Sequence, residues 1–72
     1  MIIHTSKDFG DAIRSRRKEL GYTQATLASF CGCSTVFLSA LENGKQTAEL
    51  ERALRVANTL GLDISLDPRE AR

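Results

Sequence analysis

Signals for helix boundaries recur along most of this chain. Gly21, Gly32, Gly44 and Gly61 each end a stretch with helical apolar spacing, and a Thr or Ser stands at the start of each stretch. A hydroxyl side chain caps a helix N-terminus, and glycine ends a helix readily because it adopts the left-handed conformation without steric cost. The sequence therefore predicts an all-α chain of four short helices. Its 72 residues form one small domain, 1–72, whose core is marginal without a partner.

The apolar spacing also predicts which side chains face the core. The sequence Thr-Ser-Lys-Asp at 5–8 has the form of a capping box, so the first helix begins near Ser6 and runs to Leu20. Phe9, Ile13 and Leu20 fall on one face of it. The inward residues expected of the other helices are Leu27, Ala28 and Cys31 after the cap Thr23, Leu38 and Leu41 after the cap Ser34, and Leu50, Leu54, Ala57 and Leu60 after Thr47, which opens the fourth.

The C-terminal tail changes period. Leu62, Ile64 and Leu66 alternate with polar residues, which is the pattern of a strand with one apolar face. A lone strand leaves its backbone unpaired, and residues 2–3 offer at most a short partner within the chain. We therefore predict that residues 62–67 form a short β-strand that pairs with the same strand of a second copy, as the dimerisation strand of a homodimer. A packed or frayed tail is the alternative.

Charge is unevenly distributed, although the formal net charge is only +1. A basic cluster occupies residues 14–18, whereas residues 20–44 contain a single acid, Glu42, and no lysine or arginine. A surface without carboxylates approaches phosphate without repulsion. The chain therefore suits nucleic acid through this local pattern, and not through the overall basicity of dedicated binders.

Other classes of protein are not expected. No stretch reaches the roughly 18 apolar residues of a membrane span, and the start of the chain lacks a signal peptide's basic and apolar regions, so we expect no membrane association and a cytoplasmic protein. Cys31 and Cys33 lack the second ligand pair of a structural zinc site and suit a small apolar core, while His4 suits solvent. This set offers no catalytic constellation. We therefore expect no enzyme, no metal, no cofactor and no small-molecule ligand.

The segment TQATLASFCGCSTVFLSALENGK at 23–45 resembles the helix-turn-helix of the XRE and lambdoid phage repressor/Cro family. Thr-Gln opens one helix, Gly stands at the turn, and the next helix ends Leu-Glu-Asn-Gly-Lys. The likeness extends through LERALRVANTLGLDISL. The chain is most similar to HipB-type antitoxins in its short length, in the segment RSRRKELGYTQ that leads into the helix-turn-helix, and in its strand-like end. The resemblance implies a lambda-repressor-like bundle and a homodimer that binds palindromic operator DNA, represses its own operon and holds a HipA-type serine/threonine kinase toxin.

The resemblance also implies DNA-contacting positions. Gln24, at a helix N-terminus, matches a position that contacts phosphate, and Glu42 matches a glutamate that holds Arg17 near the DNA backbone. Plain alternatives remain: an exposed glutamine and a fold-stabilising ion pair. The other implied positions are the phosphate-gripping Asn43, the Gly44 amide and Lys45, and the third-helix residues Ser34, Thr35, Val36, Phe37, Ser39 and Ala40.

The third helix departs from better-known repressors. Those repressors often carry Gln, Arg or Asn at the base-facing positions, for bidentate hydrogen bonds to bases that are each worth roughly 1–3 kcal/mol of discrimination. None of these three residue types occupies the corresponding positions Thr35, Val36, Ser39 and Ala40. Val36 and the Thr35 methyl can touch thymine methyl groups, so we expect weak base readout, with specificity from half-site spacing and DNA deformability and a shallow salt dependence.

A second function fits the same residues. A helix-turn-helix module that serves as a protein-interaction adaptor, without strong DNA binding, would present Val36 and Phe37 to another protein. Phe37 therefore has two open roles, half-burial against the second helix or contact with a groove or partner. A protein that combines both functions would bind DNA with one face and the toxin with another.

Overall fold

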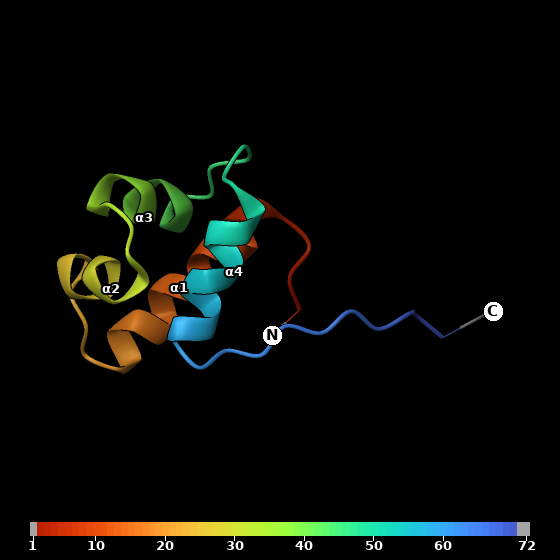
Figure 1. Cartoon of the computed structure of the whole chain (residues 1–72). Helices are drawn as coiled ribbons and strands as arrows, with labels where there is room; N and C mark the ends of the chain where they lie inside the picture. The colour runs from red at the N-terminus through yellow and green to blue at the C-terminus, as the bar shows by residue number, and fades with distance from the viewer. Residues whose placement is uncertain (1, 71–72) are drawn as a thin grey trace.

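Four α-helices and no strand are found in residues 2–70, the part of the chain that the computed structural model describes. Figure 1 shows α2 and α3 together at one end of the body, next to α1 and α4. Helix α3 packs against α1 and α2, and α2 also packs against α4. The predicted all-α class with four helices is confirmed; residues 1 and 71–72 of the predicted domain lie outside the described residues. The helices are α1 (Ser6–Glu19), α2 (Gln24–Cys31), α3 (Thr35–Glu42) and α4 (Leu50–Thr59).

Three helix N-termini are capped as predicted. The hydroxyls of Thr5, Thr23 and Ser34 accept hydrogen bonds of 3.0, 3.1 and 3.0 Å from the backbone N–H three residues ahead. At α1 the Asp8 carboxylate also accepts the N–H of His4, an exposed residue as predicted. The glycines predicted to end the four helices all have positive φ. The local boundary signals therefore operate as expected at α1, α2 and α3.

The start of α4 was predicted incorrectly. Thr47 does not open the helix: it lies in a turn, and α4 begins at Leu50 after Glu49, which makes no side-chain capping bond. The chain uses these residues to cross from α3 to α4, and Ala48 packs against the core on the way. Leu50 is consequently 69% exposed rather than inward.

Side chains from all four helices build the core. Ile13, Leu27, Leu38 and Leu60 are each at most 1% exposed, which confirms the predicted inward faces at these positions. The inward stripe of α4 is carried by Ala53, Val56 and Ala57 as well as Leu60, and Cys31 is buried as predicted. Leu20 was predicted inward and is 38% exposed, because it follows the last residue of α1.

The predicted C-terminal strand is absent from the described chain. Leu62 packs against the core, residues 63–67 continue as an extended segment away from the body (Figure 1), and no strand is formed in residues 2–70. Ile64 is 48% and Leu66 94% exposed. A strand needs a neighbouring backbone for its hydrogen bonds, and the N-terminal segment does not provide one. The tail of the single chain therefore corresponds to the alternative, a packed or frayed tail.

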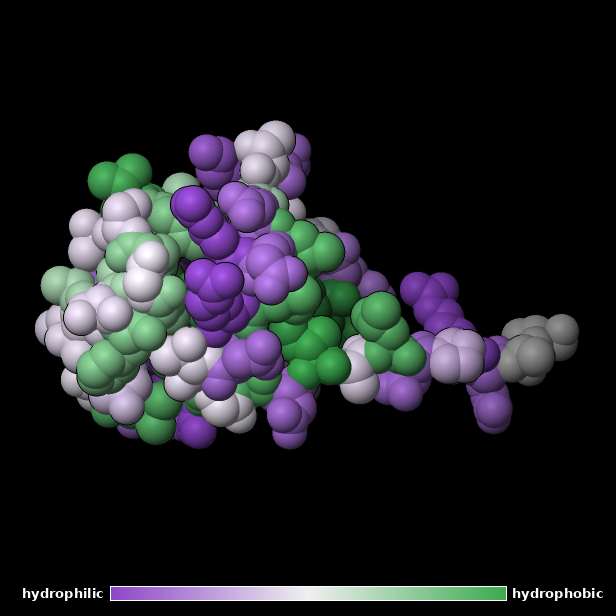
Figure 2. All heavy atoms as spheres, in the orientation of Figure 1, coloured by the Kyte–Doolittle hydropathy of each residue, from purple (hydrophilic) through white to green (hydrophobic). Residues whose placement is uncertain are grey.

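A hydrophobic patch lies where the body meets this tail (Figure 2). It borders a groove of about 940 Å³ whose apolar lining includes Ile2, Ile3, Phe9, Leu62 and Ile64. No single helix within residues 2–70 is long and apolar enough to cross a membrane. Helices α2 and α3 reach that length and hydropathy only when they are taken together, as a pair bent by 111°.

Candidate nucleic-acid interface

The turn between α2 and α3 sets the geometry of the site. Gly32 caps α2 in the left-handed conformation, at φ 69°, and the N–H of Cys33 returns to the carbonyl of Ala28 at 3.0 Å. A residue with a side chain would cost roughly 1–2 kcal/mol in this conformation. The two helices meet at 111°, within the range of helix-turn-helix motifs.

This geometry exposes the N-terminal turn of α3. Ser34, whose hydroxyl caps the helix, and Thr35 are exposed, and Val36 is 78% exposed. Ser39 and Ala40, predicted to face base edges with them, are only half exposed. The first turn of α3 is therefore the most accessible part of the predicted recognition surface, and its side chains are small and uncharged.

A buried ion pair lies behind this surface. Arg17 donates from Nε and Nη2 to the two carboxylate oxygens of Glu42, at 2.7 and 2.9 Å, and from Nη1 to the carbonyl of Tyr22 at 2.9 Å. Gln24 adds a hydrogen bond from Nε2 to Glu42 at 3.1 Å. Arg17 is 8% and Glu42 4% exposed. The predicted pairing of Arg17 with Glu42 is thus present, and it also fixes Gln24 at the start of α2.

The pair keeps Glu42 ionised. Burial alone would raise the pKa of Glu42, but hydrogen bonds from Arg17 and Gln24, with the charges of Arg17 and Arg14, hold that pKa below its usual value. The hydrogen bonds that Arg17 donates to the Glu42 carboxylate likewise raise the pKa of Arg17, against the effect of burial. The only acid between residues 20 and 44 is therefore ionised, neutralised by Arg17 and shielded from an approaching phosphate.

The loop after α3 is a tight helix stop. The N–H of Gly44 donates to Leu41 and that of Lys45 to Ala40, each at 3.0 Å, which is the Schellman arrangement. The Gly44 amide predicted to grip a phosphate is therefore already occupied, since a helix C-terminus satisfies its own carbonyls first. The Asn43 side chain also donates to the carbonyl of Ser39, at 2.9 Å.

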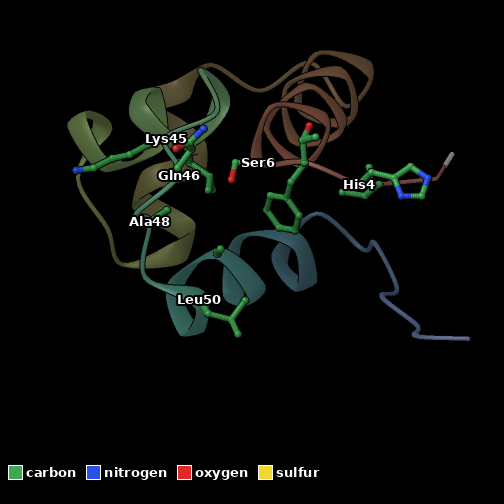
Figure 3. A pocket seen from close by; sticks show the side chains of 11 residues that line it. His4, Ser6, Lys45, Gln46, Ala48 and Leu50 are labelled. Atoms are coloured by element: carbon green, nitrogen blue, oxygen red, sulfur yellow. The ribbon is translucent and has the colours of Figure 1, made fainter. Parts of the chain in front are cut away.

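The Lys45 side chain remains available beside this stop. Figure 3 shows it extending away from a pocket of about 360 Å³ between the start of α1 and the start of α4. Leu50 and Ala48 line that pocket with Ser6 and Gln46. Within residues 2–70, no three His, Cys, Asp or Glu residues lie close enough to hold a metal ion.

One residue that positions the site carries no signal of chemistry in the sequence. A Cβ built on Gly10 of α1 would lie 2.7 Å from the carbonyl oxygen of Glu42 and 2.9 Å from its carbonyl carbon, and closer still to the carbonyl oxygen of Leu41. The bare Gly10 backbone therefore lets α1 approach the last turn of α3. A glycine inside a helical pattern was the only available sign of this close approach.

Phe37 and the two cysteines lie beside the turn. Phe37 is half-buried and packs against the core, and the guanidinium carbon of Arg52 lies 5.8 Å from its ring centroid. Cys31 and Cys33 are free thiols, the first buried and the second half-buried. Burial and the neighbouring Cys31 raise the pKa of Cys33.

The fold and sequence are similar to those of known regulators. Residues 13–66 match the helix-turn-helix family HTH_3. The chain is 41% identical over 71 residues to y4mF, an HTH-type transcriptional regulator of Sinorhizobium fredii, covering 97% of this chain and 93% of that protein. It is 45% identical over 49 residues to an HTH-type transcriptional regulator of Methanothermobacter thermautotrophicus, covering 68% and 71%.

Solved structures share the same architecture. The HipB–O4 20mer complex matches with a TM-score of 0.87 at 23% identity, over 97% of this chain and 99% of that chain. The HipA–HipB–O2–O3 complex matches with a TM-score of 0.88 at 23% identity, again over 97% and 99%. The resemblance in sequence is thus confirmed in the fold, which is that of HipB.

Proposed function

The chain belongs to the helix-turn-helix family of transcriptional regulators, and from that membership we propose that it works as a DNA-binding repressor. It binds a palindromic operator as a homodimer, represses its own operon and pairs with a HipA-type serine/threonine kinase toxin. The family consists of regulators and is not a class of enzymes.

One observation carries the DNA-binding part of the proposal. The N-terminal turns of α2 and α3 form an exposed surface without a free carboxylate, because Glu42 is buried and held by Arg17. Helix N-termini favour anions through their free N–H groups and dipoles. This surface therefore suits a DNA backbone, and in this proposal α3 enters the major groove.

Contacts to phosphate and contacts to bases fall on different residues. In this proposal Lys45 and Gln24 contact the DNA backbone, while Thr35 and Val36, exposed in the first turn of α3, meet base edges and thymine methyl groups. Because no bidentate donor is present, most specificity comes from DNA shape and from the spacing of the two half-sites.

Fluorescence anisotropy tests this proposal directly. The purified protein is titrated onto DNA from upstream of its own gene and onto scrambled DNA of equal length, over a series of salt concentrations. We expect the upstream fragment to bind at least about a thousandfold more tightly, as specific binders typically do. Val36→Ala should reduce this preference, whereas Lys45→Ala should weaken both DNAs alike. Equal effects of the two substitutions would contradict base readout by α3.

The homodimer is proposed to form through residues 62–67. Ile64 and Leu66 are exposed beside the apolar groove of the body, and a second copy related by a two-fold axis would pair the two tails as antiparallel strands. We expect Ile64→Asp to convert a dimer into a monomer in sedimentation experiments, while Ser65→Asp, on the opposite side of the strand, should preserve the dimer. A dimer unaffected by Ile64→Asp would exclude this interface.

The toxin partnership is supported by the shared fold with the HipB chain of a HipA-containing complex. It is tested by co-expression with a HipA-type kinase from the same genome. We expect the two proteins to copurify and the complex to bind operator DNA more tightly than the repressor alone, through linked binding. Failure to copurify would leave a stand-alone repressor.

A second function is favoured by the exposure of Val36, which is large for an apolar side chain. In this alternative the first turn of α3 docks on a protein and the module acts as an adaptor. Equal and weak binding to the upstream and scrambled DNAs would support it over the repressor.

A further inference from the structure

The basic cluster on α1 contains two kinds of cation. Arg16 and Arg17 are held by protein groups: Arg16 by Glu19 and the carbonyl of Leu60, and Arg17 by Glu42. Arg14 and Lys18 are exposed, and within residues 2–70 neither forms an ion pair. They stand four residues apart, so their side chains share one face of α1.

This face lies next to the helix-turn-helix surface. Gly10, one helical turn before Arg14, touches the last carbonyls of α3, and Arg17, almost one turn after it, is bonded to Glu42. Arg14 therefore stands on α1 beside the C-terminal end of α3. Its charge acts on the Glu42 carboxylate, as expected for a guanidinium at this position.

The buried ion pair leaves the neighbouring helices without positive charge of their own. The buried pair of Arg17 and Glu42 sums to zero, and Gln24 is neutral, so the pair contributes no net attraction for phosphate. Residues 20–44 contain no lysine or arginine. Arg14, with Lys18 beyond it, supplies the positive charge that α2 and α3 lack.

We propose that Arg14 and Lys18 form a row of phosphate contacts contributed by α1, which flanks the helix-turn-helix and binds the DNA backbone outside the segment touched by α2 and α3. The inference rests on the proposed DNA-binding function and extends its footprint. Arg17, which the family resemblance places near the backbone, acts instead as a positioning residue for Glu42 and Gln24, because three of its donors are already engaged.

The test measures the salt dependence of binding for Arg14→Gln, Lys18→Gln and the double variant. Each lost phosphate contact lowers the slope of log K against log salt by about 0.9. A dimer loses two contacts per substitution, so we expect a decrease of about 1.8 for each single variant and about 3.6 for the double variant. Affinity should fall equally for upstream and scrambled DNA, and Arg14→Lys should retain the slope.

Arg55→Gln provides the matched control. Arg55 is an exposed arginine on α4 near Cys33, so its substitution removes the same charge at another place. Its slope should equal that of the wild type. The inference is overturned if the wild type binds DNA and Arg14→Gln keeps the full slope, or if Arg55→Gln lowers the slope as much. A wild type that binds no DNA would instead refute the proposed function, and this inference with it.

Discussion

Replacing Gly10 with alanine should destabilise this protein, although the same change within a solvent-facing helix normally stabilises. Gly10 lies inside α1 and is absent from the glycines with positive φ, so alanine fits its backbone conformation. The obstacle is the space around it. The added methyl carbon would meet the backbone carbonyls of Leu41 and Glu42 at distances that real Cβ atoms essentially never show.

Two opposing effects set the size of the change. Alanine gains about 1 kcal/mol over glycine in a helix interior. Against this, an extra methyl group in a close-packed contact costs about 1–3 kcal/mol, and the upper end applies because the obstructing atoms are backbone and cannot rotate away. We expect a net loss of about 2 kcal/mol in the free energy of unfolding, or roughly 8–16 °C in Tm for a domain of this size.

Urea denaturation followed by circular dichroism measures this loss. Gly10→Ala should lower the midpoint without changing the m-value. Ser15→Ala, at an exposed position of the same helix, is the control and should be neutral or stabilise by about 0.5 kcal/mol. Because α3 ends against Gly10, the variant should also bind DNA less well when folded. A Gly10→Ala protein as stable as the wild type would refute the close approach of α1 and α3.

Three further substitutions or reactions test particular contacts. The pKa of Glu42 lies below its ordinary 4.5 in the folded state, so the contribution of Glu42 to stability is present above pH 4.5 and is lost as the pH falls through the folded pKa. Glu42→Gln should abolish that part of the acid transition and should cost about 3–5 kcal/mol in the free energy of unfolding, because Arg17 stays buried without a counter-charge. Urea titrations at a series of pH values measure both effects. Thr23→Ala removes the hydrogen bond to the Thr26 N–H and should cost about 1 kcal/mol, whereas Thr23→Ser should retain it; equal midpoints for both variants would contradict a capping role. The pKa of Cys33 lies above its ordinary 9.0, mainly through burial, so iodoacetamide should alkylate it more slowly than free cysteine at neutral pH, as mass spectrometry will measure, and a faster rate would contradict its burial.

Much of the fold is predictable because its determinants are local. A hydroxyl at Thr5, Thr23 or Ser34 bonds an N–H only three residues away, and Gly32 needs no distant contact to adopt the left-handed conformation. The resemblance to a known family also predicted the pairing of Arg17 with Glu42, which the structure contains. Short-range geometry and a shared motif therefore predicted α1 to α3 and the helix-turn-helix.

Tertiary packing decided the rest. Thr47 carries a capping side chain, yet α4 begins at Leu50, because the path from α3 to α4 and the burial of Ala48 outweigh a local preference. The tail has the alternation of a strand, but backbone pairing requires a neighbour that its own sequence does not contain.

The cations on α1 show the same division most clearly. Arg14 and Arg17 stand in one basic run and look equivalent along the sequence. Only the approach of α3, which the bare backbone of Gly10 permits, buries Arg17 against Glu42 and leaves Arg14 exposed. The sequence by itself determined that the charges lie on α1. Which of them is neutralised depends on distances between elements far apart in the chain, because Coulomb energies and desolvation follow spatial separation and burial.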